Sequence, residues 1–349
     1  MHYSKKVIAS MPKAYAIGTF DGADARSFVV GVEKDGPIRR FALDGTPMET
    51  VTEGPGGVMT IAQVPGRDDV LLATSEFFSP NYGADTAGIV AYVRSGDGTW
   101  SSKRLCDLPY VHRFGLLTGA DGRLWVIACT IKGACREVKN DWLTPGAVWV
   151  APLDDVLDEP GAKLLELTEL SGCQLQNHGF WCAPDHGSVL ISTAAGVFRY
   201  VPPAAAGEAW QVSCLIVQPT SDICVADFDG DGCDEILALS AFHGDTLSVW
   251  HETDVADTYE CVWTDPEKHD FLHAIWGGEL LGEACAVVGN RKGGRDLLRV
   301  FFSDGAYRLE VIDHDRGPAN CWVIEDGGAA RIIAANRETD EVALYDVIA

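Results

Sequence analysis

The feature that most constrains this chain is a segment plan that recurs along its 349 residues. Each copy has a short strand-like stretch, an acidic or glycine-rich turn and a strongly apolar second strand. The copies start near Tyr15, Met59, His112, His178, Val225, His273 and Asn320. The last four starts are 47, 48 and 47 residues apart, and the earlier steps of 44, 53 and 66 residues carry extra loop length. A period of roughly 40–50 residues with about four strands per unit is typical of a β-propeller.

This repeat predicts an all-β fold, a single seven-bladed β-propeller domain spanning residues 1–349. Helical periodicity is nearly absent, and short apolar runs rich in Val, Ile, Leu, Trp and Phe alternate with Gly, Asp and Pro. The last copy ends too early to contain its own outermost strand. We therefore expect residues 5–9 to complete the last blade and close the ring, which removes open sheet edges. The alternative is a pair of β-sandwiches.

Net charge and cysteine content limit which classes of binding partner and which cellular compartment we expect. The chain has 51 acidic and 27 basic residues, a formal net charge of −24, so nucleic acid is not an expected partner. It has no long basic run and no apolar run of membrane-spanning length, so a membrane is not expected either. The N-terminus lacks a signal-peptide pattern, and the eleven cysteines form no C-x-x-C pair, so we expect a cytoplasmic protein with free thiols.

The stretch VADFDGDGCDEILAL, residues 225–239, falls in the turn between the first two strands of the fifth unit. Its carboxylates suit Ca²⁺ and belong to Asp227, Asp229, Asp231 and Asp234. The pattern departs from an EF-hand because Ala238 stands where a late bidentate glutamate is required. It resembles instead the D-x-D-G-D-G-x-x-D calcium loop of FG-GAP (VCBS-type) repeats in integrin-like propellers. The alternative is an acidic, solvated turn that holds no metal.

Three units begin with a histidine at the same repeat position: His112, His178 and His273. The innermost strand of a blade lines the central channel, so we expect these side chains to project near the axis on one face. Imidazole suits Zn²⁺ or a similar divalent ion, and Mg²⁺ and Mn²⁺ are the other ions we consider. The alternative is that the three rings only fill the mouth of the channel.

The turns between the second and third strands fall on that same face and add further candidates. They contain Glu76, Tyr82, His243, Arg291 and Arg337. In so acidic a chain, arginines gathered at one mouth would bind a carboxylate, a phosphate or a polarised oxygen. The alternative is that these arginines form salt bridges at the rim.

Units six and seven, FLHAIWGGELLGEACAVVGNRKGGRDLLRVF and GPANCWVIEDGGAARIIAANRETDEVALYDV, carry a family resemblance. They resemble the propeller domain of aldos-2-ulose dehydratases (1,5-anhydro-D-fructose dehydratases) and a group of bacterial VCBS-repeat proteins. The resemblance implies a metal-dependent carbon–oxygen lyase, a dehydratase acting by β-elimination on a keto-sugar or related small carbohydrate. The family's additional cupin domains have no counterpart in this sequence, so we do not expect an isomerase step.

The implied elimination needs an electrophile, a base and an acid. A metal at His112, His178 and His273 would polarise the sugar carbonyl, and Arg291 or Arg337 would support the enolate. His243, Glu76 or Tyr82 would serve as base or acid. Two alternatives remain open: a propeller-type polysaccharide or oligosaccharide lyase, similar to ulvan lyases, and a calcium-stabilised, non-catalytic propeller that binds a carbohydrate or a protein.

Overall fold

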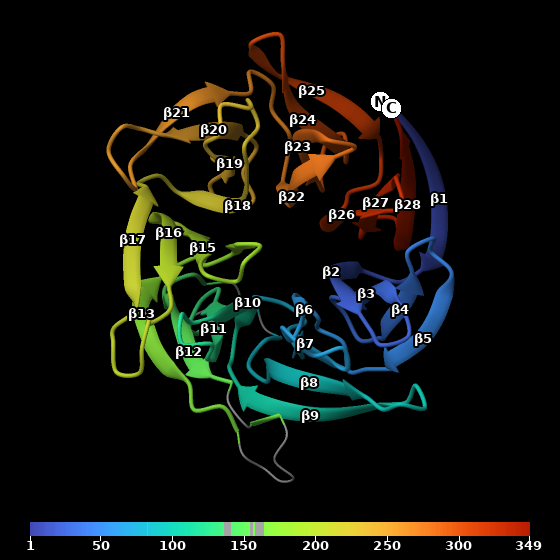
Figure 1. The fold of residues 1–349 in the computed structure, drawn as a ribbon, viewed down its shortest axis with the longest axis vertical. Coiled ribbons are helices and arrows are strands. Elements are labelled where there is room, and N and C mark those ends of the chain that lie inside the picture. The colour runs from blue at the N-terminus through green and yellow to red at the C-terminus, as the bar shows by residue number, and fades with distance from the viewer. Residues whose placement is uncertain (82, 136–140, 154–155, 158–163) are drawn as a thin grey trace.

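Seven four-stranded antiparallel sheets surround a central axis in the computed structural model (Figure 1). The structure describes residues 1–81, 83–135, 141–153, 156–157 and 164–349. This arrangement confirms the seven-bladed β-propeller and excludes the pair of β-sandwiches. Within those ranges, no helix has the length and apolar character needed to cross a membrane.

The first three blades follow the chain from the innermost strand outwards. Blade 1 contains β2 (Ala14–Asp21), β3 (Arg26–Val32), β4 (Ile38–Ala42) and β5 (Pro47–Thr52). Blade 2 contains β6 (Ile61–Gln63), β7 (Val70–Ser75), β8 (Gly88–Arg94) and β9 (Trp100–Asp107). Blade 3 contains β10 (Val111–Thr118), β11 (Leu124–Thr130), β12 (Gly146–Pro152) and β13 (Thr168–Gln174).

The next three blades repeat this order. Blade 4 contains β14 (Gly179–Cys182), β15 (Val189–Thr193), β16 (Gly196–Val201) and β17 (Gln211–Ile216). Blade 5 contains β18 (Thr220–Ala226), β19 (Glu235–Ser240), β20 (Leu247–Glu252) and β21 (Tyr259–Thr264). Blade 6 contains β22 (Leu272–Leu280), β23 (Glu283–Asn290), β24 (Leu297–Ser303) and β25 (Ala306–Asp313).

Blade 7 joins the two ends of the chain. It contains β26 (Asn320–Asp326), β27 (Ala329–Asn336), β28 (Glu341–Ile348) and, outermost, β1 (His2–Ser10). β1 pairs antiparallel with β28 from His2 opposite Ile348 to Ser10 opposite Glu341, and the two termini lie side by side in Figure 1. The predicted closure by the N-terminal strand is therefore confirmed, and the closing strand extends beyond residues 5–9 at both ends.

The core lies between neighbouring blades, which cover both faces of each inner sheet region. β7 and β15 are buried along their whole length, whereas the outermost strands β13 and β17 are largely open to solvent. Strands covered on both faces have near-continuous apolar sequences, which explains the strongly apolar second strand of each repeat.

Close approach of the innermost strands brings neighbouring blades together around the axis. A Cβ atom added at Gly179 would lie 2.0 Å from Ser192 Oγ and 2.5 Å from the Cα atom of Asp222 in the next blade. Only glycine fits such a contact. Polar residues at the inner edges of blades 4 and 5 are thereby held near one another.

Antiparallel pairing divides the connections between two ends of the ring. We call the upper end the one that carries the starts of the innermost strands and the connections between second and third strands. The lower end carries the connections between first and second strands. The predicted calcium loop, between β18 and β19, is at the lower end of blade 5, and the connection from β19 to β20 is at its upper end.

Candidate functional site: a histidine cluster at the upper end

Four histidines meet near the axis at the upper end. His112 is the second residue of β10, His273 is the second residue of β22, and His178 directly precedes β14. His243 comes from the connection between β19 and β20. The ring centroids of His112 and His178 are 4.6 Å apart. The centroid of His178 is also 5.2 Å from that of His243 and 5.2 Å from that of His273. We call these four residues the histidine cluster.

Three members of the cluster have ring nitrogens at metal-binding separations. One nitrogen from each of His178, His243 and His273 lies within 4.8 Å of the other two. His112 packs against His178 but does not belong to this group of three. The sequence prediction grouped His112 with His178 and His273 because these three share a repeat position. His243 lies in a loop outside that position, so the repeat could not place it in the metal-binding group.

Backbone carbonyls set the proton positions on two of these imidazoles. Nδ1 of His178 lies 3.1 Å from the Ser221 carbonyl oxygen, and Nδ1 of His273 lies 2.8 Å from that of Ala319. Each Nδ1–H therefore donates to the next blade and leaves Nε2 unprotonated, with a lone pair that can accept a hydrogen bond or bind a metal ion. Nε2 of His178 is buried and has no hydrogen-bond partner among the described residues. Metal-binding histidines are commonly oriented by such a second hydrogen bond.

Burial keeps the cluster uncharged. His112, His178 and His273 are at most 3% exposed, and desolvation, followed by positive or imidazole neighbours, lowers the pKa of each far below its usual value. Burial, then Arg291 and Lys292, lowers the pKa of His243 to about 3. Neutral imidazole is the form that binds a metal ion.

Tyr15 connects two of the histidines. Its hydroxyl lies 3.1 Å from Nε2 of His273 and 3.3 Å from Nε2 of His112, and burial raises its pKa to about 12. The sequence prediction did not include Tyr15 among the site residues. The signal was present, since Tyr15 starts the first repeat where other repeats have histidine.

Aromatic side chains surround the cluster. The His243 ring stacks between Phe242 and Phe271, with centroid distances of 3.8 and 4.2 Å. Phe77 contacts His112 edge-on at 5.2 Å. His243 itself adopts a φ angle of +54°, a left-handed conformation that is uncommon outside glycine and asparagine. The packing therefore holds the ring in a backbone geometry that local preference alone disfavours.

The two predicted arginines form ion pairs at the rim. Arg291 donates from Nε and Nη2 to Glu338, at 2.9 and 2.8 Å, and its guanidinium lies over the Phe271 ring. Arg337 pairs with Glu33 and, at 2.8 Å, with Glu338. The Phe271 ring lies between Arg291 and His243. Arg291 therefore acts on His243 through its positive charge and not through direct contact.

Of the two remaining predicted residues, Glu76 is not brought into contact with the cluster. Glu76 pairs with Arg104 at 2.5 Å, and it is the following residue, Phe77, that packs on His112. Tyr82 lies outside the described residues.

A buried ion pair lies directly below the cluster and was not predicted. Arg113 donates from Nη1 to the Met59 carbonyl at 2.9 Å, and its Nη2 lies 3.6 Å from Asp222 Oδ2. That same Oδ2 is 4.0 Å from Nδ1 of His178. Burial raises the pKa of Asp222 to about 6.

The acidic loop at the lower end of blade 5 forms a second oxygen-rich group. It brings together one carboxylate oxygen from each of Asp227, Asp229, Asp231 and Glu235 within 4.8 Å. Asp234 is not in this group. Consecutive residues at the start of β19 point to opposite sides, so Asp234 is exposed while Glu235 is buried.

Glu235 is the buried anchor of this loop. Its Oε2 accepts from the Phe228 backbone N–H at 2.7 Å, whereas its buried Oε1 has no hydrogen bond within the described part of the chain. Burial is the largest cause that raises the Glu235 pKa to about 7. His251 Nε2 lies 3.1 Å from Asp231 Oδ2 and adds a nitrogen at the edge of the group.

The fold and its two residue groups define a seven-bladed β-propeller with a buried histidine cluster at one end and an acidic loop at the other. No family model matches the chain, and no curated protein matches it. The functional argument therefore rests on the geometry of the chain itself.

Proposed function

We propose that this propeller is a metal-dependent carbon–oxygen lyase that eliminates water, or an alcohol, next to the carbonyl of a small carbohydrate. The observation that carries the proposal is the group formed by His178, His243 and His273. Three neutral imidazoles with a coordination position left open are the usual protein contribution to a catalytic zinc site. A bound Zn²⁺ or similar ion would act there as a Lewis acid toward the carbonyl oxygen.

Tyr15 and His112 supply the proton transfers in this proposal. Elimination removes a proton from the carbon beside the carbonyl, forms a carbon–carbon double bond and expels hydroxide from the next carbon; the proton and hydroxide together make water. His112, kept neutral by burial, accepts the proton. Tyr15, kept protonated by its raised pKa, donates to the leaving oxygen.

The Tyr15 hydroxyl has one proton and two imidazole neighbours. When Nε2 of His273 is a metal ligand, the hydroxyl turns to Nε2 of His112, 3.3 Å away. That pairing places the acid and the base in direct contact, so the proton taken up by His112 can return through Tyr15. Arg291 acts at a distance, since its charge helps to hold His243 neutral.

We also propose that the acidic loop holds a structural Ca²⁺. Three aspartates and Glu235 supply hard oxygen ligands, and the glycines Gly230 and Gly232 adopt φ angles of +79° and +94° that wrap the backbone around them. Oε1 of Glu235 supports this assignment, because it is buried without a hydrogen bond and has His251 Nε2 only at 3.6 Å, so a bound cation would satisfy it more closely.

The test combines elemental analysis with an elimination assay on protein purified without a histidine tag. We expect one transition-metal ion per chain, together with an ultraviolet-absorbing conjugated product from at least one keto-sugar. His178→Ala and His273→Ala should lose both. His314→Ala is the matched control, because His314 is exposed and pairs with Asp296, and neither residue belongs to the cluster. A parent protein without a transition metal, or cluster variants with full activity, would contradict the proposal.

A further inference from the structure

The central channel contains a large cavity that the histidine cluster does not use. It has a volume of about 1000 Å³ and extends from the middle of the innermost strands to the turns of the lower end. A volume of this size is ample for a small organic ligand. None of the four histidines lines it, and neither does Tyr15. The cavity is therefore a space separate from the proposed catalytic site.

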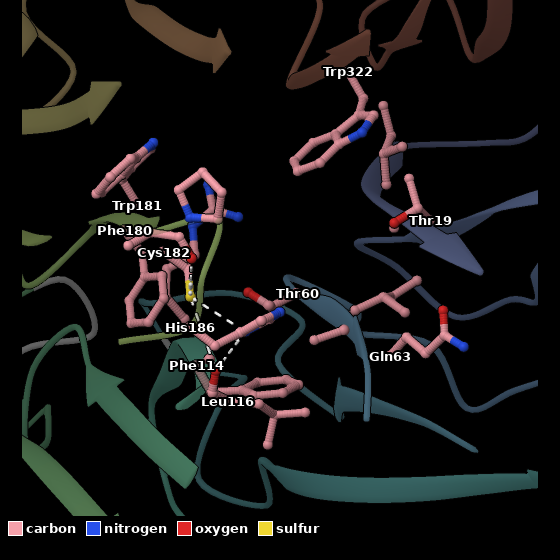
Figure 2. A pocket seen from close by; sticks show the side chains of 18 of the residues that line it. Thr19, Thr60, Gln63, Phe114, Leu116, Phe180, Trp181, Cys182, His186 and Trp322 are labelled. Carbon is pink, nitrogen blue, oxygen red and sulfur yellow. Dashed lines mark hydrogen bonds between the residues drawn. The ribbon is translucent and has the colours of Figure 1, made fainter. Parts of the chain in front are cut away.

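Three tryptophans from three different blades face this cavity. Trp181 lies on β14, Trp276 on β22 and Trp322 on β26. Figure 2 shows Trp181 and Trp322 projecting from separate walls into the same open space. All three are partly exposed, Trp322 to 37%, although large aromatic residues are normally buried in a core. Trp181 and Trp276 also pack against core residues, so each of them presents only part of its ring to the cavity, whereas Trp322 is the most exposed of the three.

The indole N–H groups of these tryptophans are also available. None of the three Nε1–H groups has a hydrogen-bond acceptor among the residues that the structure describes. None of these nitrogen atoms is fully buried without a partner, so a ligand in the cavity could reach them. An indole that offers both a flat apolar face and an unused donor suits a ligand with apolar C–H faces and hydroxyl groups.

The floor of the cavity is the buried pair Arg113–Asp222. Asp222 Oδ1 accepts from the backbone N–H groups of Phe180 and Ile223, at 3.1 and 2.9 Å. Among the described residues, the ionisable neighbours of its Oδ2 are Arg113 Nη2 at 3.6 Å and His178 Nδ1 at 4.0 Å, both beyond good hydrogen-bonding distance. The floor thus offers one unused acceptor beside one donor. A hydroxyl can donate to the first and accept from the second.

We propose that this cavity binds a neutral pyranose sugar, as a monosaccharide or disaccharide, independently of the histidine cluster. The C–H faces of the sugar ring pack on Trp181, Trp276 and Trp322, and a hydroxyl at the inner end bridges Asp222 and Arg113. The opposite charges of the floor cancel, which favours a neutral ligand. A purely apolar ligand would leave Asp222 Oδ2 buried without a hydrogen bond, at an energetic cost.

Isothermal titration calorimetry with glucose, galactose, maltose and cellobiose tests this site directly. We expect at least one of these sugars to bind the parent protein. Trp322→Ala and Trp276→Ala should each weaken that binding by about tenfold or more, because each removes one stacking face. Trp263→Ala, in outer strand β21 and packed on Tyr307, should bind like the parent.

Two further variants separate this site from the metal site. Asp222→Asn preserves side-chain shape and should weaken sugar binding, while His273→Gln should leave it unchanged. Binding of none of the four sugars, equal binding by Trp322→Ala and the parent, or loss of binding in His273→Gln would each overturn the proposal. Circular dichroism of every variant identifies those that fail to fold. Trp322→Ala should disturb folding least, because Trp322 is exposed.

Discussion

The two groups proposed to bind ions lie at opposite ends of blade 5 and are built in opposite ways. The histidine cluster collects His178, His243 and His273 from three different blades, and burial makes its imidazoles neutral. The acidic loop takes all its carboxylates from residues 227–235, mostly in contact with solvent. A site shared among blades requires the closed ring, whereas a site within one turn requires only its own hairpin. The same fold therefore combines a global site with a local one.

The largest expected effect is the loss of elimination activity when Tyr15, beside the histidine cluster, is changed. Tyr15→Phe removes one hydroxyl and should lower elimination activity by roughly 10²–10⁴-fold, the usual contribution of a general acid or base. The metal content should remain at the parental level, because Tyr15 is not among the three proposed ligands. Steady-state kinetics and elemental analysis measure the two quantities, and Tyr307→Phe in blade 6 is the control. Loss of metal from Tyr15→Phe would instead make Tyr15 part of the metal site.

The next effect is on the stability of the local site. Calcium that binds only the folded loop should raise the melting temperature by several degrees at saturating concentrations. Asp229→Asn should abolish this calcium-dependent increase. Asp234→Asn, a neighbouring aspartate outside the oxygen group, should retain it. Calorimetric melts with calcium and with a chelator make the measurement, and equal behaviour of the two variants would contradict the assigned ligands.

The two groups should respond to pH with opposite sign in ion-free protein. The pKa of His243 is about 3 in the fold against 6.5 ordinarily, so its contribution to stability is lost as pH falls below about 6.5. The pKa of Glu235 is raised from 4.5 to about 7, so stability falls as pH rises through that interval.

Chemical denaturation across pH separates these contributions. His243→Asn tolerates the positive φ angle and should flatten the acidic side of the profile. Glu235→Gln should flatten the decline between about pH 4.5 and 7, the interval between the two Glu235 pKa values. Variants with profiles identical to the parent would show that neither group is linked to folding.

The smallest expected effect concerns Arg291. Replacing it by glutamine removes a nearby positive charge and should raise the pKa of His243. In ion-free protein, His243 should then take up its proton at a pH higher by less than about one unit, since rim charges are partly screened. Chemical denaturation of the ion-free protein across the acidic range measures this shift. A complete loss of activity at neutral pH would indicate instead that Arg291 touches the substrate.

The architecture could be predicted because it depends on a signal repeated seven times. Apolar second strands and acidic turns recur along the chain, and the short last unit indicated that β1 completes blade 7. Repetition made each strand assignment support the others, so errors at single positions did not change the fold. The same repeat predicted His178 and His273 as candidate metal ligands at one end of the ring.

Several residues of the two sites could not be found in this way. His243 enters the proposed metal-binding group through a loop. Glu235, and not Asp234, lies in the proposed calcium group because of the direction of one side chain at a strand start. Arg113 and Asp222 lie within apolar strand sequences, where nothing marks them as a buried pair. The cavity between the lower turns has no sequence signature, because its walls come from several blades.

By itself, the sequence determined the blade number, the strand that closes the ring and the turn that carries the aspartates. These follow from local hydrophobic pattern and from spacing along the chain, which act before any long-range contact forms. The tertiary structure alone decided which histidine nitrogens meet, which tautomers they adopt and which three tryptophans line the same cavity. Those features depend on distances across the central axis, and such distances exist only once all seven blades have closed.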